Sequence, residues 1–126
     1  MAGDEVRRYE ARARSTDTFG RVLVSCRDQH LVIDGPTDNG CPGEAITPAE
    51  TFLAAVASCG VELLAVIARD RGITLGGVRA AIEGTIDRAN PVDPDHTLFD
   101  TVRLELELEG VADAEGDELV EAFKSR

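Results

Sequence analysis

The feature that most constrains this chain is a long apolar segment near its middle. Residues 52–68 read FLAAVASCGVELLAVIA, in which only Ser58, Gly60 and Glu62 interrupt the apolar side chains. A helix that is apolar on all its faces must be buried on nearly every side. A membrane span needs about 20 apolar residues, and Glu62 would lie near its centre, so we predict a core helix instead.

Local signals mark the two ends of this helix. Thr47 is the predicted N-cap, Pro48 takes the first helical position, and Glu50 stands three residues after the cap, where it completes a capping box. Gly72 predicts that the helix ends at about Arg71. At 1.5 Å per residue the helix is roughly 36 Å long, which is long for a domain of this size.

Short strands are predicted before the helix. Residues 19–25 (FGRVLVS) and 30–34 (HLVID) are rich in β-branched side chains and flank a turn, which predicts a hairpin. Residues 5–14 (EVRRYEARAR) alternate only in part and fit an edge strand or a short helix, of which we favour the strand. Residues 34–43 are so dense in Gly, Pro, Asn and Asp that we expect a loop.

After the helix the apolar period changes to two. Residues 78–86 and 99–109 alternate apolar and polar side chains, which predicts two long antiparallel strands. Residues 113–126 carry acidic side chains first and basic ones last, as a final helix would. This order of elements predicts an α+β fold with a mostly antiparallel sheet around the long apolar helix.

The size of the chain predicts one domain, and its apolar helix predicts a dimer. Its 126 residues, 43% of them hydrophobic, suit one compact domain over residues 1–126. One sheet covers only one side of the central helix, so the remaining apolar surface needs another element. A second copy of the chain is the economical source of that element, and we expect an obligate two-fold homodimer.

Charge and cysteine content argue against several classes of function. Asp and Glu outnumber Lys and Arg by 24 to 13, for a formal net charge of -11, so we expect neither nucleic acid nor membrane surfaces as partners. The first residues show no secretory or transit pattern, and we expect a cytoplasmic protein. Cys26, Cys41 and Cys59 lack C-x-x-C spacing, so we expect neither a disulfide framework nor a thiolate zinc site. We also expect no other metal site and no cofactor.

The helix and its surroundings resemble a known family. The helix segment TPAETFLAAVASCGVELLAVIARDRGI, the preceding loop DNGCPGEAI and the following strand LGGVRAAIEGTIDR are together similar to the OsmC/Ohr family, over nearly the whole chain. The resemblance implies an intertwined α+β homodimer. It also implies a function, because the best-studied members reduce organic hydroperoxides with a pair of cysteines, in oxidative or osmotic stress defence.

By this resemblance Cys59 matches the attacking thiolate of the family. The family's second cysteine lies in a Cys-Pro turn after the last helix, a place beyond Arg126, where this sequence ends. The resemblance therefore leaves the sulfenic acid of Cys59 to be resolved by an outside thiol. Dithiols such as lipoyl groups restore the enzyme in that family.

The remaining site residues are less well defined. Peroxidase members carry a carboxylate ten residues before the helix cysteine, where this chain has Ala49, and Glu50 stands one place later. A thiolate in an apolar helix needs a nearby cation, which we expect to be an arginine from the sheet. The sequence does not choose among Arg12, Arg14 and Arg21.

Each candidate also has a purely structural interpretation. Cys59 suits inert packing as well as nucleophilic attack. Glu50 has a sufficient role in the capping box. Cys41 fits an unreactive loop thiol as well as a substitute resolving thiol. Two functions stay open: thiol-dependent reduction of organic hydroperoxides, and non-catalytic binding of a small hydrophobic ligand by a dimer of the same fold.

Overall fold

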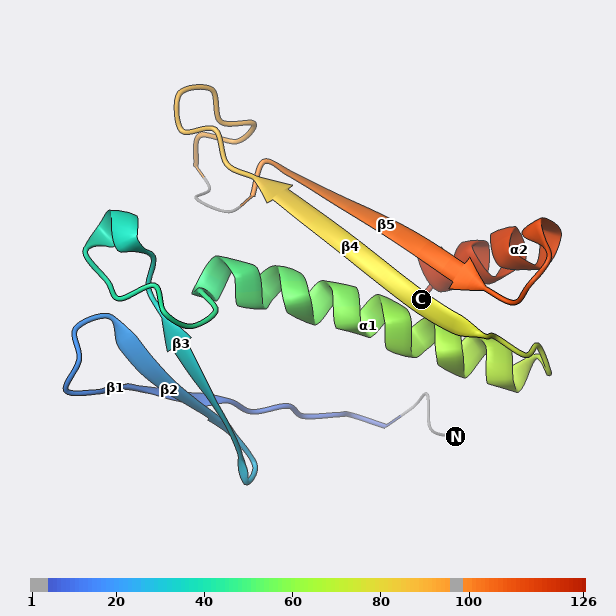
Figure 1. Ribbon diagram of the computed structural model, residues 1–126, viewed down its shortest axis with the longest axis horizontal. Coiled ribbons are helices and arrows are strands. Elements are labelled where there is room, and N and C mark those ends of the chain that lie inside the picture. The colour runs from blue at the N-terminus through green and yellow to red at the C-terminus, as the bar shows by residue number, and fades with distance from the viewer. Residues whose placement is uncertain (1–4, 96–98) are drawn as a thin grey trace. The chain divides into compact units, whose positions relative to one another are not determined.

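The computed structural model describes residues 5–95 and 99–126. The chain divides into two compact units, Met1–Thr51 and Phe52–Arg126. Each unit has its own antiparallel sheet, three-stranded in the first and two-stranded in the second (Figure 1). The α+β class is confirmed, with two sheets in place of the one expected. The single domain over residues 1–126 stays a prediction.

The N-terminal unit is built on a short sheet of order β1-β2-β3. Strand β2 (Arg21–Cys26) pairs with β3 (Gln29–Asp34) as the predicted hairpin, and β1 (Arg12–Ser15) pairs with the other edge of β2. The strand expected over residues 5–14 is wrong for residues 5–11, which pair with no strand in the part of the chain described. The apolar side chains of Val6 and Tyr9 in this segment are exposed, so burial of these side chains does not stabilise a longer strand.

The loop after β3 leads into the long helix. A short 3-10 turn, η2 (Thr37–Asn39), interrupts the predicted loop. Helix α1 (Pro48–Asp70) begins with the predicted capping box, in which the Thr47 backbone N–H donates to Glu50 Oε1 at 3.0 Å and the Glu50 N–H donates to Thr47 Oγ1 at 3.3 Å. The helix start is therefore determined by residues within one turn of each other.

The end of α1 is equally local. Gly72 adopts a left-handed φ of 68°, its N–H donates to the Arg69 carbonyl at 3.1 Å, and the Ile73 N–H donates to the Ala68 carbonyl at 2.8 Å. This pair of bonds is a Schellman motif, which satisfies carbonyls that the helix end leaves free. A glycine is favoured at this position because a Cβ would strain the left-handed backbone.

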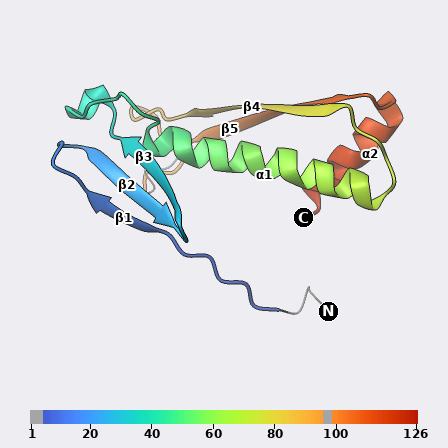
Figure 2. The same ribbon diagram turned by 60° about the horizontal axis from the view of Figure 1, so that its bottom comes forward.

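The C-terminal unit packs two helices on one face of a β-ribbon. Strands β4 (Gly77–Thr85) and β5 (Thr101–Glu109) pair antiparallel along their whole length, and α2 (Asp113–Lys124) follows. Figure 2 shows α1 and α2 on the same face of this ribbon. The core joins the two helices to the ribbon through four buried side chains, Leu64, Ile67, Ala68 and Leu119, with partly buried neighbours that include Val78, Leu106 and Phe123.

Most of α1 is open to solvent in the single chain. Its buried residues are Gly60, Leu64, Ile67 and Ala68, and only 22% of its most apolar window is buried. By its length and composition alone, the helix is long and apolar enough to cross a membrane. The core helix of a soluble protein can have the same length and composition. The burial expected on nearly every side is therefore not met by one chain, because β4, β5 and α2 contact only one face of the helix.

Candidate functional site

Cys59 lies on an exposed face of α1. Helical residues spaced alternately by four and three share a face, so Cys59 shares one with Phe52, Val56, Leu63 and Val66. Phe52 and Val56 are 53% and 38% exposed, Cys59 is exposed, and Leu63 and Val66 are half-buried. We call this row of five side chains the exposed stripe. The thiol is thus accessible in the single chain and has apolar neighbours along the helix.

Packing of the next residue explains why Cys59 faces outward. Gly60 is buried, and a Cβ built on it would lie 3.5 Å from Phe123 Cζ and 3.8 Å from the Cδ2 atoms of Leu104 and Leu106. Consecutive helical residues point about 100° apart. With Gly60 turned to the core, the Cys59 side chain points away from it.

Glu50 completes the capping box at the start of α1. Its Oε1 accepts hydrogen bonds from the Thr47 backbone at 3.0 Å and from Thr47 Oγ1 at 2.8 Å. These two bonds lower the pKa of the Glu50 carboxyl, because they stabilise the charged form. The observed contacts of Glu50 are those of a structural residue. Glu50 belongs to the N-terminal unit and Cys59 to the C-terminal unit.

Arg21 is committed to a buried carboxylate. Its Nε and Nη2 donate to the two oxygens of Asp34 at 2.7 and 2.8 Å, and Nη2 also lies 3.2 Å from Glu44 Oε1. Asp34 has no exposed surface and also accepts the backbone N–H groups of Glu44 and Ala45 at 3.0 and 3.1 Å. The Arg21 hydrogen bond, against the cost of burial, lowers the pKa of Asp34 from 3.8 to about 2, and Asp34 raises the pKa of Arg21.

This ion pair closes the loop that precedes α1. Arg21 and Asp34 are direct cross-strand partners in the β2–β3 register, and the Asp34 N–H also donates to the carbonyl of Ile46. In the sequence, Asp34 is predicted only as the end of a strand. The sequence does place a carboxylate at the end of one apolar strand and an arginine at the start of the preceding strand. In an antiparallel hairpin these two positions are opposite each other, so this pattern could have predicted the Arg21–Asp34 ion pair.

The other two candidate arginines differ in their contacts. Arg12 Nη2 donates to the backbone carbonyl of Arg27 at 3.3 Å, and Arg14 is exposed on the same strand. Neither forms an ion pair within residues 5–95 and 99–126. Of the three candidates, Arg21 is the one whose guanidinium is already occupied by carboxylates.

The other two cysteines lie in the N-terminal unit. Cys41 is half-buried, and a Cβ built on either Gly20 or Gly35 would clash with its Sγ, so the thiol fills the space over two glycines. Cys26 is half-buried at the end of β2. These contacts favour packing as the role of Cys41. In the part of the chain that is described, no group of three or more His, Cys, Asp or Glu side chains is arranged to hold a metal ion.

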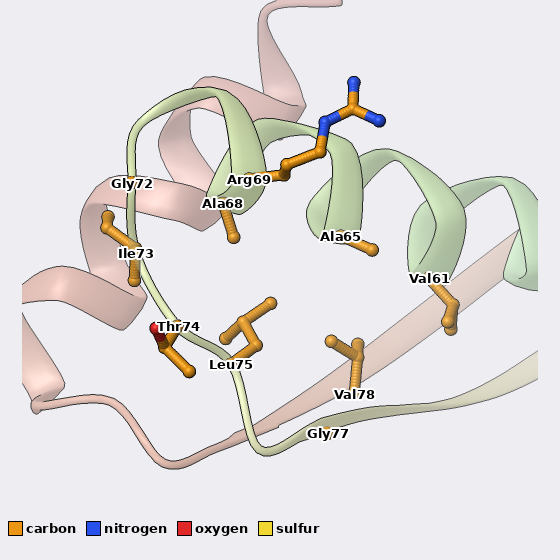
Figure 3. A pocket seen from close by; sticks show the side chains of 10 residues that line it. All are labelled: Val61, Ala65, Ala68, Arg69, Gly72, Ile73, Thr74, Leu75, Gly77 and Val78. Carbon is orange, nitrogen blue, oxygen red and sulfur yellow. The ribbon is translucent and has the colours of Figure 1, made fainter.

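An apolar cavity lies in the C-terminal unit but does not include Cys59. Its volume is about 560 Å³, and Figure 3 shows Val61, Ala65 and Ala68 of α1 facing Leu75 and Val78 across it. Arg69 also borders this cavity, but its guanidinium is paired with Asp70 at 3.1 Å. The arrangement can hold a small apolar molecule beside the C-terminal half of α1.

A family model described as OsmC-like protein matches residues 41–126. The chain belongs to the OsmC family. The matched segment includes Cys41, Glu50 and Cys59 and excludes the three candidate arginines. No curated protein matches this chain.

Solved structures of OsmC proteins share the fold. An OsmC-like protein from Mycoplasma pneumoniae has a TM-score of 0.81 and 16% identity, over 95% of this chain and 82% of its own. An organic hydroperoxide resistance protein OsmC from Legionella pneumophila has a TM-score of 0.68 and 23% identity, over 95% and 84% of the two chains. OhrB of Bacillus subtilis, an organic hydroperoxide resistance protein, has a TM-score of 0.58 and 18% identity, over 93% and 83%. At these identities the likeness establishes the OsmC fold.

Proposed function

We propose that this OsmC-like protein reduces organic hydroperoxides with Cys59 as the reactive thiol. The observation that carries the proposal is the accessible Cys59 thiol within the segment that matches the family, on an apolar row of α1. Neighbouring structures that are named organic hydroperoxide resistance proteins support the same activity. A hydroperoxide with an apolar organic group fits the exposed stripe better than hydrogen peroxide does, because the stripe offers apolar contact.

The proposed chemistry has two steps. The Cys59 thiolate attacks the terminal oxygen of R–O–OH, the O–O bond breaks, and the alkoxide takes up a proton to leave as ROH. Cys59 is then a sulfenic acid. An external dithiol reduces it, which returns the thiol and yields the oxidised disulfide and water. A cation must favour the thiolate, and Arg12 and Arg14 are the candidates that need not first leave a carboxylate.

We propose that the working form is a homodimer in which a second copy covers α1. The exposed stripe has the four-three spacing of a helix–helix seam, and water-exposed Phe and Val side chains in that spacing are unfavourable without a partner.

The protein would act in the cytoplasm, where thiols stay reduced, without a nucleic acid or membrane partner.

Trapping of the oxidised thiol tests the activity. The reduced protein receives one equivalent of cumene hydroperoxide and then dimedone, and its intact mass is measured. We expect one dimedone adduct per chain in the wild type, in Cys26→Ser and in Cys41→Ser, and none in Cys59→Ser. A wild-type mass without the adduct, or an adduct that persists in Cys59→Ser, contradicts the proposal.

Light scattering after size-exclusion chromatography tests the dimer. Val56→Glu places a charge on the exposed stripe and should abolish the dimer mass, because a buried unpaired charge is costly. Ala81→Glu, which changes an exposed residue on the outer face of β4, is the matched control and should remain dimeric. A dimeric Val56→Glu, or a wild type that runs as a monomer, contradicts the proposal.

A second candidate function is non-catalytic binding of a small hydrophobic ligand. The apolar cavity beside the C-terminal half of α1 favours it, because its volume of about 560 Å³ suits a small molecule and its lining lacks a thiol. Ala65→Leu would fill this cavity from α1. A ligand affinity that falls in Ala65→Leu and is unchanged in Cys59→Ser would support the binding function.

A further inference from the structure

A second cavity lies at the turn between β2 and β3 in the N-terminal unit. Its volume is about 550 Å³. Three arginines, Arg8, Arg12 and Arg27, line it together with Tyr9 and the half-buried Cys26. The cavity is therefore positively charged, in a chain whose formal net charge is -11. Arg12 is also a candidate cation for Cys59, but neither candidate function described above binds a ligand in this cavity.

The charges of these arginines are not compensated by ion pairs. Among the residues that the structure describes, no ion pair joins any of the three to a carboxylate, and Glu10 is the single carboxylate in the lining. Five arginines outside the cavity have such partners, namely Arg21, Arg69, Arg71, Arg79 and Arg103. The cavity thus brings together three arginines that have no ion-pair partner among the described residues.

Two local features mark the turn beside the cavity. Arg12 Nη2 donates to the Arg27 carbonyl at 3.3 Å, which joins β1 to the turn. Arg27 has a φ of 57°, and it is the one non-glycine with positive φ among the residues described. A glycine would adopt this conformation without strain, so the turn carries a guanidinium at a position where the backbone disfavours a side chain.

We propose that this cavity binds a small polyanion through its three guanidinium groups. A planar guanidinium donates two parallel hydrogen bonds to a carboxylate or a phosphate group, and several around one cavity favour a ligand with two or more such groups. A long polyanion such as nucleic acid is disfavoured, because it would also meet the acidic remainder of the chain. At physiological salt, charges beyond about 8 Å are screened, so a small ligand senses mainly the local arginines.

The chain offers a direct readout of binding. Tyr9 is its only tyrosine and it has no tryptophan, so tyrosine fluorescence reports on this cavity alone. Inorganic pyrophosphate and citrate are titrated separately into the full chain at physiological ionic strength, with acetate as the monoanion, and calorimetry measures the same binding. We expect saturable binding of pyrophosphate, citrate or both, and none of acetate. A preference for one of the two distinguishes phosphate from carboxylate recognition.

Variants of two arginines on the same strand make the test specific. Arg12→Gln removes a lining guanidinium and should weaken binding by about tenfold or more, because hydrogen bonds to charged groups are strong. Arg14→Gln removes the same charge from β1 outside the cavity and should change the affinity by less than about twofold, since it loses only screened long-range attraction. Absence of saturable binding by both methods, equal binding of acetate, or equal losses in the two variants would overturn the proposal.

Discussion

Substitution of Gly84 by alanine should destabilise the C-terminal unit through one aromatic ring. Gly84 lies on β4 opposite Val102 of β5, and a Cβ built on it would lie 2.5 Å from Cδ1, 2.6 Å from Cε1 and 3.1 Å from Cγ of Phe99. Ordinary carbon–carbon contacts are about 3.5–4.0 Å. The Phe99 ring must therefore move by about 1 Å, which disturbs its contact with the ring of Phe52, whose centroid lies 6.0 Å from its own.

The sign of the effect follows from two opposing contributions. Forcing extra atoms into a packed site costs about 1–3 kcal/mol, which includes any loss of the aromatic pair. Alanine in a strand is favoured over glycine by about 0.5–1 kcal/mol, because alanine loses less backbone entropy on folding than glycine does. The steric cost is the larger contribution, so we expect Gly84→Ala to lower the free energy of unfolding by about 0.5–2 kcal/mol. Urea denaturation at fixed protein concentration measures this change, since concentration would affect the stability of the proposed dimer.

A double-mutant cycle isolates the cause. In a Phe99→Leu background the smaller side chain leaves room for the new Cβ, so Gly84→Ala should there be neutral or stabilising. An equal destabilisation by Gly84→Ala in both backgrounds would show that Phe99 is not responsible, and the reasoning from its contact with Gly84 would be refuted.

Three further predictions concern α1 and the buried ion pair. Gly60→Ala should raise the free energy of unfolding, measured by urea denaturation, by up to about 1 kcal/mol. Alanine favours the helix, and its Cβ would meet only ordinary contacts of 3.5–3.8 Å. A loss of stability would contradict this prediction. Leu64→Ala should lower it by about 2–5 kcal/mol, since Leu64 is fully buried, whereas an unchanged midpoint would show that the core is elsewhere. Asp34 has its pKa lowered from 3.8 to about 2, so its stabilisation is present above about pH 4 and is lost as the pH falls towards 2. Acid unfolding of Asp34→Asn should therefore lack this component, and an acid transition identical to that of the wild type would argue against the Arg21 ion pair.

Much of the fold was predictable because its signals are local. Thr47, Pro48 and Glu50 determine the start of α1 within one turn, and Gly72 its end, since caps depend on neighbours in sequence. The alternation in residues 78–86 and 99–109 likewise predicted the β4–β5 ribbon, because successive strand residues point to opposite faces. The prediction failed at residues 5–11, where partial alternation has no packing partner among the described residues.

The tertiary structure alone decided the contacts that join distant residues. Whether Arg21 meets Asp34 depends on the β2–β3 register, and whether Phe99 covers Gly84 depends on how the chain returns to β5, neither of which a local pattern encodes. The environment of Cys59 is of the same kind. The sequence showed a thiol in an apolar helix, but only the packing of Gly60 on Phe123 turns that thiol outward. Residue type thus determined which chemistry is available, and packing between elements decided which side chains remain accessible to perform it.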